Sequence, residues 1–232
     1  MFDTLLSMNY EPFFLSFKLA SITTFILFVL SIPLAWFLSQ TSSKSKPMLE
    51  ALTALPIVLP PSVIGFYILI ALSQNSPIGS FFENTFGIKL VFNFTSLVIA
   101  SCFYSLPFMV QPLQAGFENI NKNILEASYI GGKSRFETLF KVALPNIKPA
   151  ILTAIVVTFA HTVGEFGVVL MVGGSIPGET KVASVAIYEM VEIMDYSLAH
   201  RYSAIMLTMS FLVLLSVYIF NAKHKNKFAG IH

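Results

Sequence analysis

Few side chains of this chain are suited to chemistry, and one group of them has the spacing of metal ligands. His161 and Glu165 are four residues apart, so on a helix they would share one face and could hold a metal ion together. A zinc protease also needs the order H-E-x-x-H or a third ligand, and this segment offers neither. We therefore expect no metal site here and no metalloenzyme.

A second group has the spacing of a phosphate-binding loop. Gly132-Lys133-Ser134 matches the end of the pattern G-x-x-x-x-G-K-[ST]. The first glycine of that pattern would fall on residue 127, which is Ala, and no strand pattern precedes it. The phosphate cradle needs a strand-to-helix turn to aim its backbone N–H groups. The sequence therefore argues against nucleotide binding, and we expect no cofactor in this chain.

The composition indicates an integral membrane protein. Hydrophobic residues make up 55% of the 232 residues and charged residues only 11%, whereas soluble domains average about 25% charged. The net charge of +2 is too small to suggest nucleic acid as a partner, so the expected surroundings are membrane lipid. The single cysteine, Cys102, excludes an intramolecular disulfide.

Five stretches are long and apolar enough to cross a hydrocarbon core of about 30 Å. They lie at about residues 13–38, 49–73, 90–117, 148–171 and 202–222. The second contains Pro56, Pro60 and Pro61, and such prolines more often kink a span than form a filter. Val182–Tyr188 is too short to cross and predicts an interfacial or re-entrant helix. We expect an all-α polytopic bundle forming one transmembrane domain over residues 1–232.

Basic residues set the orientation of these spans. With the N-terminus outside, the inner segments hold ten Lys and Arg residues and the outer segments four, a clear positive-inside bias. The C-terminus and the loop 118–147 are then cytoplasmic. The inner residues are Lys44, Lys46, Lys122, Lys133, Arg135, Lys141, Lys148, Lys223, Lys225 and Lys227, and the outer ones are Lys18, Lys89, Lys181 and Arg201.

The loop 118–147 predicts two short helices joined by a glycine turn. Asn123 can cap the first helix, with Glu126 three residues on, and Gly131-Gly132 can end it. Ser134 and Glu137 form a second S-x-x-E start. An apolar stripe follows at helical spacing, and Pro145 bars continuation; the stripe is Phe136, Leu139, Phe140 and Ala143. The residues alone fit an ordinary helical hairpin as well as a docking element for a partner.

The same loop resembles the EAA loop of permease subunits of ABC importers. Glu126, Ala127 and Ser128 stand at its head, Gly132 falls where that motif has its glycine, and Val142-Ala143-Leu144-Pro145 replaces the family's I-x-L-P. In that family the first helix docks into a groove on a separate ATPase subunit, which binds ATP and Mg²⁺. The coupling interface implied by the resemblance is Asn123, Glu126, Ala127, Tyr129, Gly131, Gly132, Ser134, Arg135, Leu144 and Pro145.

Three further segments resemble the sulfate and molybdate branch of these permeases. They are Gly164–Gly167, Ile176–Thr180 and, for molybdate permeases in particular, Leu59–Gly65. The resemblance implies a molybdate permease of a bacterial or archaeal inner membrane, with sulfate or tungstate as the alternative substrate. It further implies a homodimer, two ATPase subunits inside and a molybdate-binding protein outside. The outer residues expected to meet that protein are Gly178, Glu179, Lys181, Glu189 and Glu192.

Glu165 is expected in the outer half of the membrane, where a carboxylate is costly and normally faces a cavity or a partner. His161 or Arg201 could pair with it and fix a gate, or Glu165 could be a packed residue without a transport role. The expected pathway and gate residues are Pro60, Pro61, Ser62, His161, Gly164, Glu165 and Gly167. An ion-coupled carrier and a membrane-embedded enzyme remain alternatives of other classes, although no internal repeat or catalytic set supports them.

Overall fold

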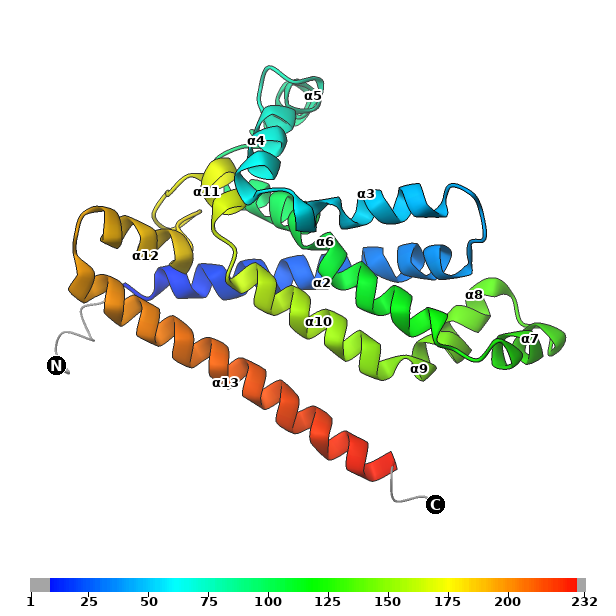
Figure 1. Ribbon diagram of the computed structural model, residues 1–232. Coiled ribbons are helices and arrows are strands. Elements are labelled where there is room, and N and C mark those ends of the chain that lie inside the picture. Colours follow the sequence, from blue (N-terminus) through cyan, green and yellow to red (C-terminus); the bar gives the residue numbers. More distant parts are fainter. Residues whose placement is uncertain (1–8, 229–232) are drawn as a thin grey trace.

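The computed structural model describes the backbone of residues 9–228 and side chains up to residue 219, so the tail lysines Lys223, Lys225 and Lys227 carry no described side chain. All regular structure in this part is helical, as the sequence predicted (Figure 1). The elements are α2 (Glu11–Gln40), α3 (Lys46–Val58), α4 (Pro61–Leu72), α5 (Pro77–Phe86), α6 (Phe94–Glu118), α7 (Lys122–Ile130), α8 (Arg135–Thr138), a π-helical turn (Leu139–Ala143), α9 (Leu144–Asn146), α10 (Lys148–Val163), α11 (Gly167–Gly173), α12 (Ala183–Glu192) and α13 (Tyr196–Phe228).

The centre of the fold is a bundle of α2, α6 and α10, which run alongside one another (Figure 1). Small residues such as Ala35 and Ala154 are completely buried where these helices meet, which lets their backbones approach closely. The largest buried cluster also includes Leu113 of α6 and Leu139 of the π-helical turn. The hairpin of residues 118–147 is therefore packed into the same core as these long helices.

The predicted second and fourth spans are both broken helices. α3 and α4 meet at Leu59-Pro60 with a bend of 110°. Pro60 and Pro61 explain the break, because neither can donate a backbone hydrogen bond and a proline pushes the residue before it into extended conformation. Leu59 has the corresponding ψ of 139°. The fourth span divides into α10 and the short α11 at residues 164–166.

Three helices of the described part are long and apolar enough to cross a membrane unaided: Glu11–Gln40, Phe94–Glu118 and Tyr196–Ile219. Counting each of two bent pairs as one span raises the total to as many as five. One of these pairs is the broken second span, and the other joins Arg135–Asn146 to α10 through an 80° bend. The helix before that bend does not stop at Pro145, as predicted, but one residue later at Asn146.

The end of the bundle at which α2 begins is closed by α11 and α12. Val182–Tyr188, predicted as an interfacial or re-entrant helix, falls on α12, whose backbone N–H of Ala183 donates to Ser16 Oγ of α2 at 2.9 Å. Only the start of α13 is anchored there, through Tyr202, which stacks on Phe13 with ring centroids 5.1 Å apart. From that point α13 diverges from the bundle (Figure 1).

Candidate functional site

The first helix of the hairpin at residues 118–147, α7, begins two residues earlier than predicted. Its cap is Asn121, whose side-chain oxygen accepts a hydrogen bond from the Asn123 backbone N–H at 3.0 Å. Asn123 itself lies in the first turn, so its predicted capping role is wrong. The reason is local: either asparagine can cap a helix, and the turn that leaves α6 at Asn119 decides which one does.

The turn after α7 depends on Gly132. The Lys133 N–H donates to the Ser128 carbonyl at 3.2 Å and the Gly132 N–H to the Tyr129 carbonyl at 3.0 Å. This pair of bonds is the Schellman motif, whose penultimate residue takes the left-handed conformation. Gly132 accordingly has φ of 78°, whereas Gly131 has an ordinary φ of −72°. The predicted glycine turn is present, and only Gly132 needs to be glycine for conformational reasons.

The second helix starts with the predicted capping box. The Glu137 N–H donates to Ser134 Oγ at 3.2 Å, and the Ser134 N–H donates back to the Glu137 carboxylate at 3.2 Å. The predicted apolar stripe, however, is split in two. Leu139 and Ala143 are buried, while Phe136 and Phe140 are exposed and contact each other. The π-helical turn from Leu139 widens the helical repeat, which rotates the two pairs onto different faces.

The two helices of the hairpin are joined by a buried hydroxyl pair. Ser128 Oγ of α7 and Thr138 Oγ1 of α8 lie 2.9 Å apart, and both side chains are buried. Leu125 packs beside them into the main core. Ser128 occupies a position where the related motif more often has Ala, and its hydroxyl has a defined partner here. This contact was not predicted, because the partner lies ten residues away across the turn.

The outward face of this hairpin carries the predicted coupling residues. All ten except the partly buried Leu144 are exposed: Asn123, Glu126, Ala127, Tyr129, Gly131, Gly132, Ser134, Arg135 and Pro145. Two large apolar side chains that the sequence reasoning left out stand beside them. Ile130 is 88% exposed and Phe136 71% exposed. Apolar side chains exposed this fully on a polar hairpin are typical of a surface that a partner covers.

The break between α3 and α4 contacts the break between α10 and α11. A Cβ on Gly167 would lie 2.9 Å from the Pro61 Cβ, and one on Gly65 would lie 2.8 Å from the Met171 Cβ. These glycines therefore let α11 pack directly against α4. Gly164 has no such close contact, since a Cβ there would meet nothing closer than 3.7 Å. Pro60 and Ser62 flank this contact and are exposed.

Glu165 lies in the break between α10 and α11 and is 4% exposed. Neither of its carboxylate oxygens has a hydrogen-bond partner, so pairing with His161 or Arg201 is not what the structure shows. His161 instead places Nδ1 3.0 Å from Ser105 Oγ and stacks on Phe108. Arg201 donates to Ser197 Oγ. The break holds Glu165 through its backbone, because its carbonyl accepts a hydrogen bond from Ser184 Oγ at 2.6 Å.

The predicted docking residues lie in the loop after α11 and on α12 itself. Lys181 Nζ and the Glu189 carboxylate form an ion pair at 2.6 Å. Partial burial is the largest single influence on Glu189 and opposes its ionisation, but the hydrogen bond from Lys181, the Ser175 hydroxyl and the Lys181 charge together lower the pKa of that carboxyl below its usual value. Glu192 accepts from Tyr188, while Glu179 is exposed in the turn beside Gly178. No three His, Cys, Asp or Glu side chains of the described part are grouped so as to hold a metal ion.

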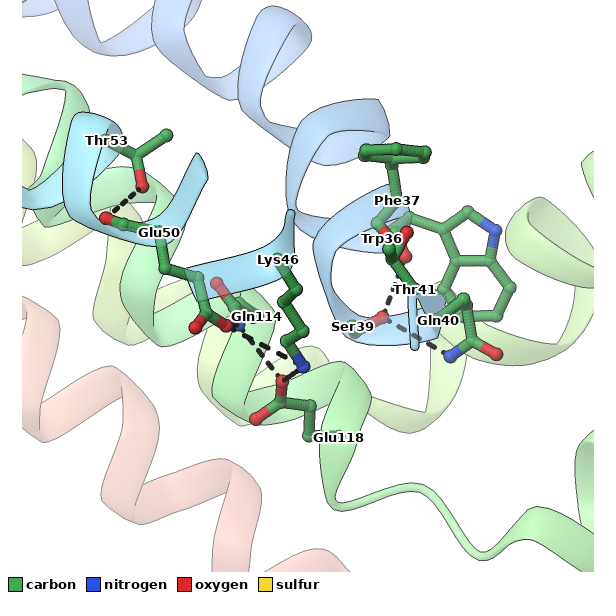
Figure 2. A network of polar contacts seen from close by, with 10 residues as sticks. All are labelled: Trp36, Phe37, Ser39, Gln40, Thr41, Lys46, Glu50, Thr53, Gln114 and Glu118. Carbon is green, nitrogen blue, oxygen red and sulfur yellow. Dashed lines mark hydrogen bonds and ion pairs between the residues drawn. The ribbon is translucent and has the colours of Figure 1, made fainter. Parts of the chain in front are cut away.

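A polar cluster that the sequence did not predict joins the start of α3 to the C-terminal end of α6. Lys46 Nζ lies 2.9 Å from the Glu118 carboxylate and 3.6 Å from that of Glu50. The Gln114 amide donates to Glu50 at 2.6 Å and to Glu118 at 3.0 Å. Figure 2 shows the four side chains converging. The Lys46–Glu50 spacing of four residues was a signal for part of it, but only the fold brings α6 alongside.

A family comparison identifies the chain. Residues 20–226 match the family described as the binding-protein-dependent transport system inner membrane component. The chain belongs to this family. It is thus a multi-pass permease of the inner membrane that works with an ATPase and a periplasmic binding protein, and nucleotide binding resides in the separate ATPase subunit. The interpretations as a secondary carrier or an enzyme are thereby excluded, and the predicted family of ABC importer permeases is confirmed.

Individual relatives are similar over most of their length. The chain is 46% identical to the molybdenum transport system permease protein ModB of Azotobacter vinelandii, over 88% of this chain and 90% of that protein. It is 29% identical to the sulfate transport system permease protein CysT of Salmonella typhimurium, over 87% of this chain and 73% of that one. The crystal structure of a bacterial alginate ABC importer includes a chain with a TM-score of 0.79 at 16% identity, covering 96% of this chain and 82% of that one. The last similarity concerns the fold alone.

Proposed function

We propose that this permease carries molybdate into the cell as half of a homodimer that two ATPase subunits drive. The observation that carries the coupling role is the hairpin α7–α8, whose inward residues are fixed in the main core while its outward face exposes Ile130 and Phe136. Such a surface fits a groove on a soluble subunit. The assignment of molybdate rests on the 46% identity to the ModB protein of Azotobacter vinelandii, which is above the 29–34% identity to sulfate permeases.

The second copy is supported by the unburied surface of α3. No residue of α3 is fully buried, and Met48, Leu52 and Val58 are between 55% and 80% exposed. A second α3 related by twofold symmetry would cover this face and enclose a pathway between the two copies. In this arrangement Pro60, Pro61 and Ser62 at the α3–α4 break and Gly167 at the α10–α11 break lie along that pathway, with His161 and Gly164 at the end of α10.

Glu165 serves as a gate element in this proposal. Its side chain is buried at the α10–α11 break and lacks a partner, and α12 holds its carbonyl oxygen through Ser184. A displacement of α12 on the outer face is thereby transmitted to the break. Gly178, Glu179, Lys181, Glu189 and Glu192 then form the surface on which the binding protein docks.

Reconstituted uptake tests the function. The permease, its ATPase and the binding protein are placed in proteoliposomes with ATP inside, and uptake of molybdate is measured with excess sulfate or tungstate as competitor. Molybdate uptake should require hydrolysable ATP and should continue in the presence of excess sulfate. Uptake of sulfate in place of molybdate would assign the chain to the sulfate branch, and uptake without the ATPase would contradict the proposal altogether.

Cysteine labelling tests the orientation. In a Cys102→Ser background, cysteines at the exposed positions Asn84, Glu179 and Ser43 are treated on intact cells with a membrane-impermeant thiol reagent. We expect reaction at the first two positions and protection at Ser43, with the outer sites shielded when the loaded binding protein docks. Reaction at Ser43 alone would invert the orientation and separate the hairpin from any cytoplasmic ATPase.

A further inference from the structure

We propose that Lys46, Glu50, Gln114 and Glu118 form a latch that carries movement of the coupling hairpin to α3. The inference rests on the proposed function, because it takes α7 as the ATPase contact and α3 as part of the pathway wall. The four side chains form one connected set, in which one ammonium group meets two carboxylates and the Gln114 amide bridges the same two carboxylates (Figure 2).

α3 is attached only weakly to the rest of the fold. Its apolar side chains are largely exposed and none of its residues is fully buried, although it lies against α6. The proline break at Leu59-Pro60 separates it from α4. At this end of α3 the half-buried Leu49 packs against the main core, and the polar cluster adds the charged contacts to α6. A charged contact of this kind can be broken and remade at lower cost than a packed apolar core.

The cluster lies beside the coupling hairpin. Glu118 is the last residue of α6, and only residues 119–121 separate it from α7. An open pocket of about 490 Å³ has Lys46 and Glu118 on one side and Leu125, Glu126 and Tyr129 of α7 on another. A further pocket of about 260 Å³ borders Glu50 and Gln114. The side chains thus have room to change partners when α7 moves.

The charges within the cluster hold it together. Lys46 is the one positive group in a cluster with two carboxylates, so its ammonium keeps Glu50 and Glu118 from repelling each other. When the hairpin is displaced toward the ATPase, Glu118 at the end of α6 shifts with the hairpin. Lys46 then either stays paired with Glu118 and draws α3 along, or loses this partner and frees α3 to move separately. The latch therefore acts as a positioning element that sets α3 according to the state of the ATPase.

Charge exchange provides the test, read as molybdate taken up per ATP hydrolysed in the complete complex. Lys46→Glu places three carboxylates together and should lower this ratio at least about fivefold while ATP hydrolysis continues. Adding Glu118→Lys restores opposite charges and should recover most of the ratio. Lys44→Glu is the matched control, since Lys44 is exposed two residues away and the charge change is the same; it should behave as the parent.

A bridging experiment avoids any folding defect. Cysteines at Ala54 of α3 and Ala115 of α6, which border the same pocket but lie outside the latch, are introduced in a Cys102→Ser background. This variant should be active before treatment, and joining the two cysteines with a short bifunctional thiol reagent should stop uptake. A parental ratio in Lys46→Glu, an equal loss in Lys44→Glu, no recovery in the double exchange, or full uptake after complete bridging would each overturn the latch. If the parent complex takes up no molybdate, both the proposed function and the latch are wrong. If the parent transports molybdate and the latch variants transport it equally well, only the latch is wrong.

Discussion

Replacing Gly132 should uncouple ATP hydrolysis from transport, and the structure gives the size of the effect. Gly132 has φ of 78° as the left-handed residue of a Schellman motif, and a Cβ there would meet nothing within 4 Å. The penalty is therefore conformational and not steric: about 1–2 kcal/mol for a non-glycine residue, and more for a β-branched one. A penalty of this size shifts the balance between the capped turn and other arrangements by about five- to thirtyfold.

Three variants separate this cause from others. Gly132→Val should lower molybdate uptake per ATP hydrolysed by about tenfold or more, while insertion into the membrane stays normal because no span is changed. Gly132→Asn should lose much less, since asparagine tolerates the left-handed conformation. Gly131→Ala is the matched control: its φ is −72°, and the added Cβ would lie 3.3 Å from the Ala127 carbonyl oxygen.

The assay is ATP hydrolysis and molybdate uptake measured on the same proteoliposomes. Molybdate uptake per ATP hydrolysed should be highest in the parent and nearly as high in Gly131→Ala. It should be lower in Gly132→Asn and lowest in Gly132→Val. Full uptake by Gly132→Val with normally stimulated hydrolysis would refute the argument that this turn positions the coupling helix. An equal loss in Gly131→Ala would refute the conformational explanation.

Three other outcomes are expected. Ser128→Ala leaves the buried Thr138 hydroxyl unpaired and should destabilise the hairpin by about 1–3 kcal/mol, whereas adding Thr138→Val should restore most of the stability; hydrogen exchange of the α7 amides measures both, and additive losses would contradict the pairing. Glu165→Gln should insert and assemble normally but alter uptake or leak, because it removes the charge and keeps the shape; parent-like uptake across a pH series would make Glu165 a packing residue only. Because the pKa of Glu189 is lowered, its ion pair with Lys181 should stabilise the protein above the ordinary glutamate pKa of about 4.3 and lose that effect as the pH falls through the lower folded value. The difference in melting temperature between the parent and Glu189→Gln should accordingly vanish in strong acid; a difference that persists there would contradict the assigned role of the charge.

The sequence by itself determined the class of the protein and most of its coupling hairpin. Composition and apolar length suffice for an all-helical membrane protein, because a chain in lipid must satisfy its backbone groups within helices. Glycine, proline and S-x-x-E signals act over three to six residues, so the turn at Gly132 and the box at Ser134 could be predicted from local chemistry. The same locality explains the error at Asn123, where two candidate caps lay two residues apart.

Only the tertiary structure decided which side chains meet. The Ser128–Thr138 pair, the contact of Gly167 with Pro61 and the cluster around Lys46 each join segments whose separation in sequence carries no signal. Spacing suggested that Glu165 pairs with His161, yet the break after Val163 removes the helical repeat that the spacing assumed. Local propensity fixes where helices start and stop, whereas partners depend on how the bundle brings those helices together.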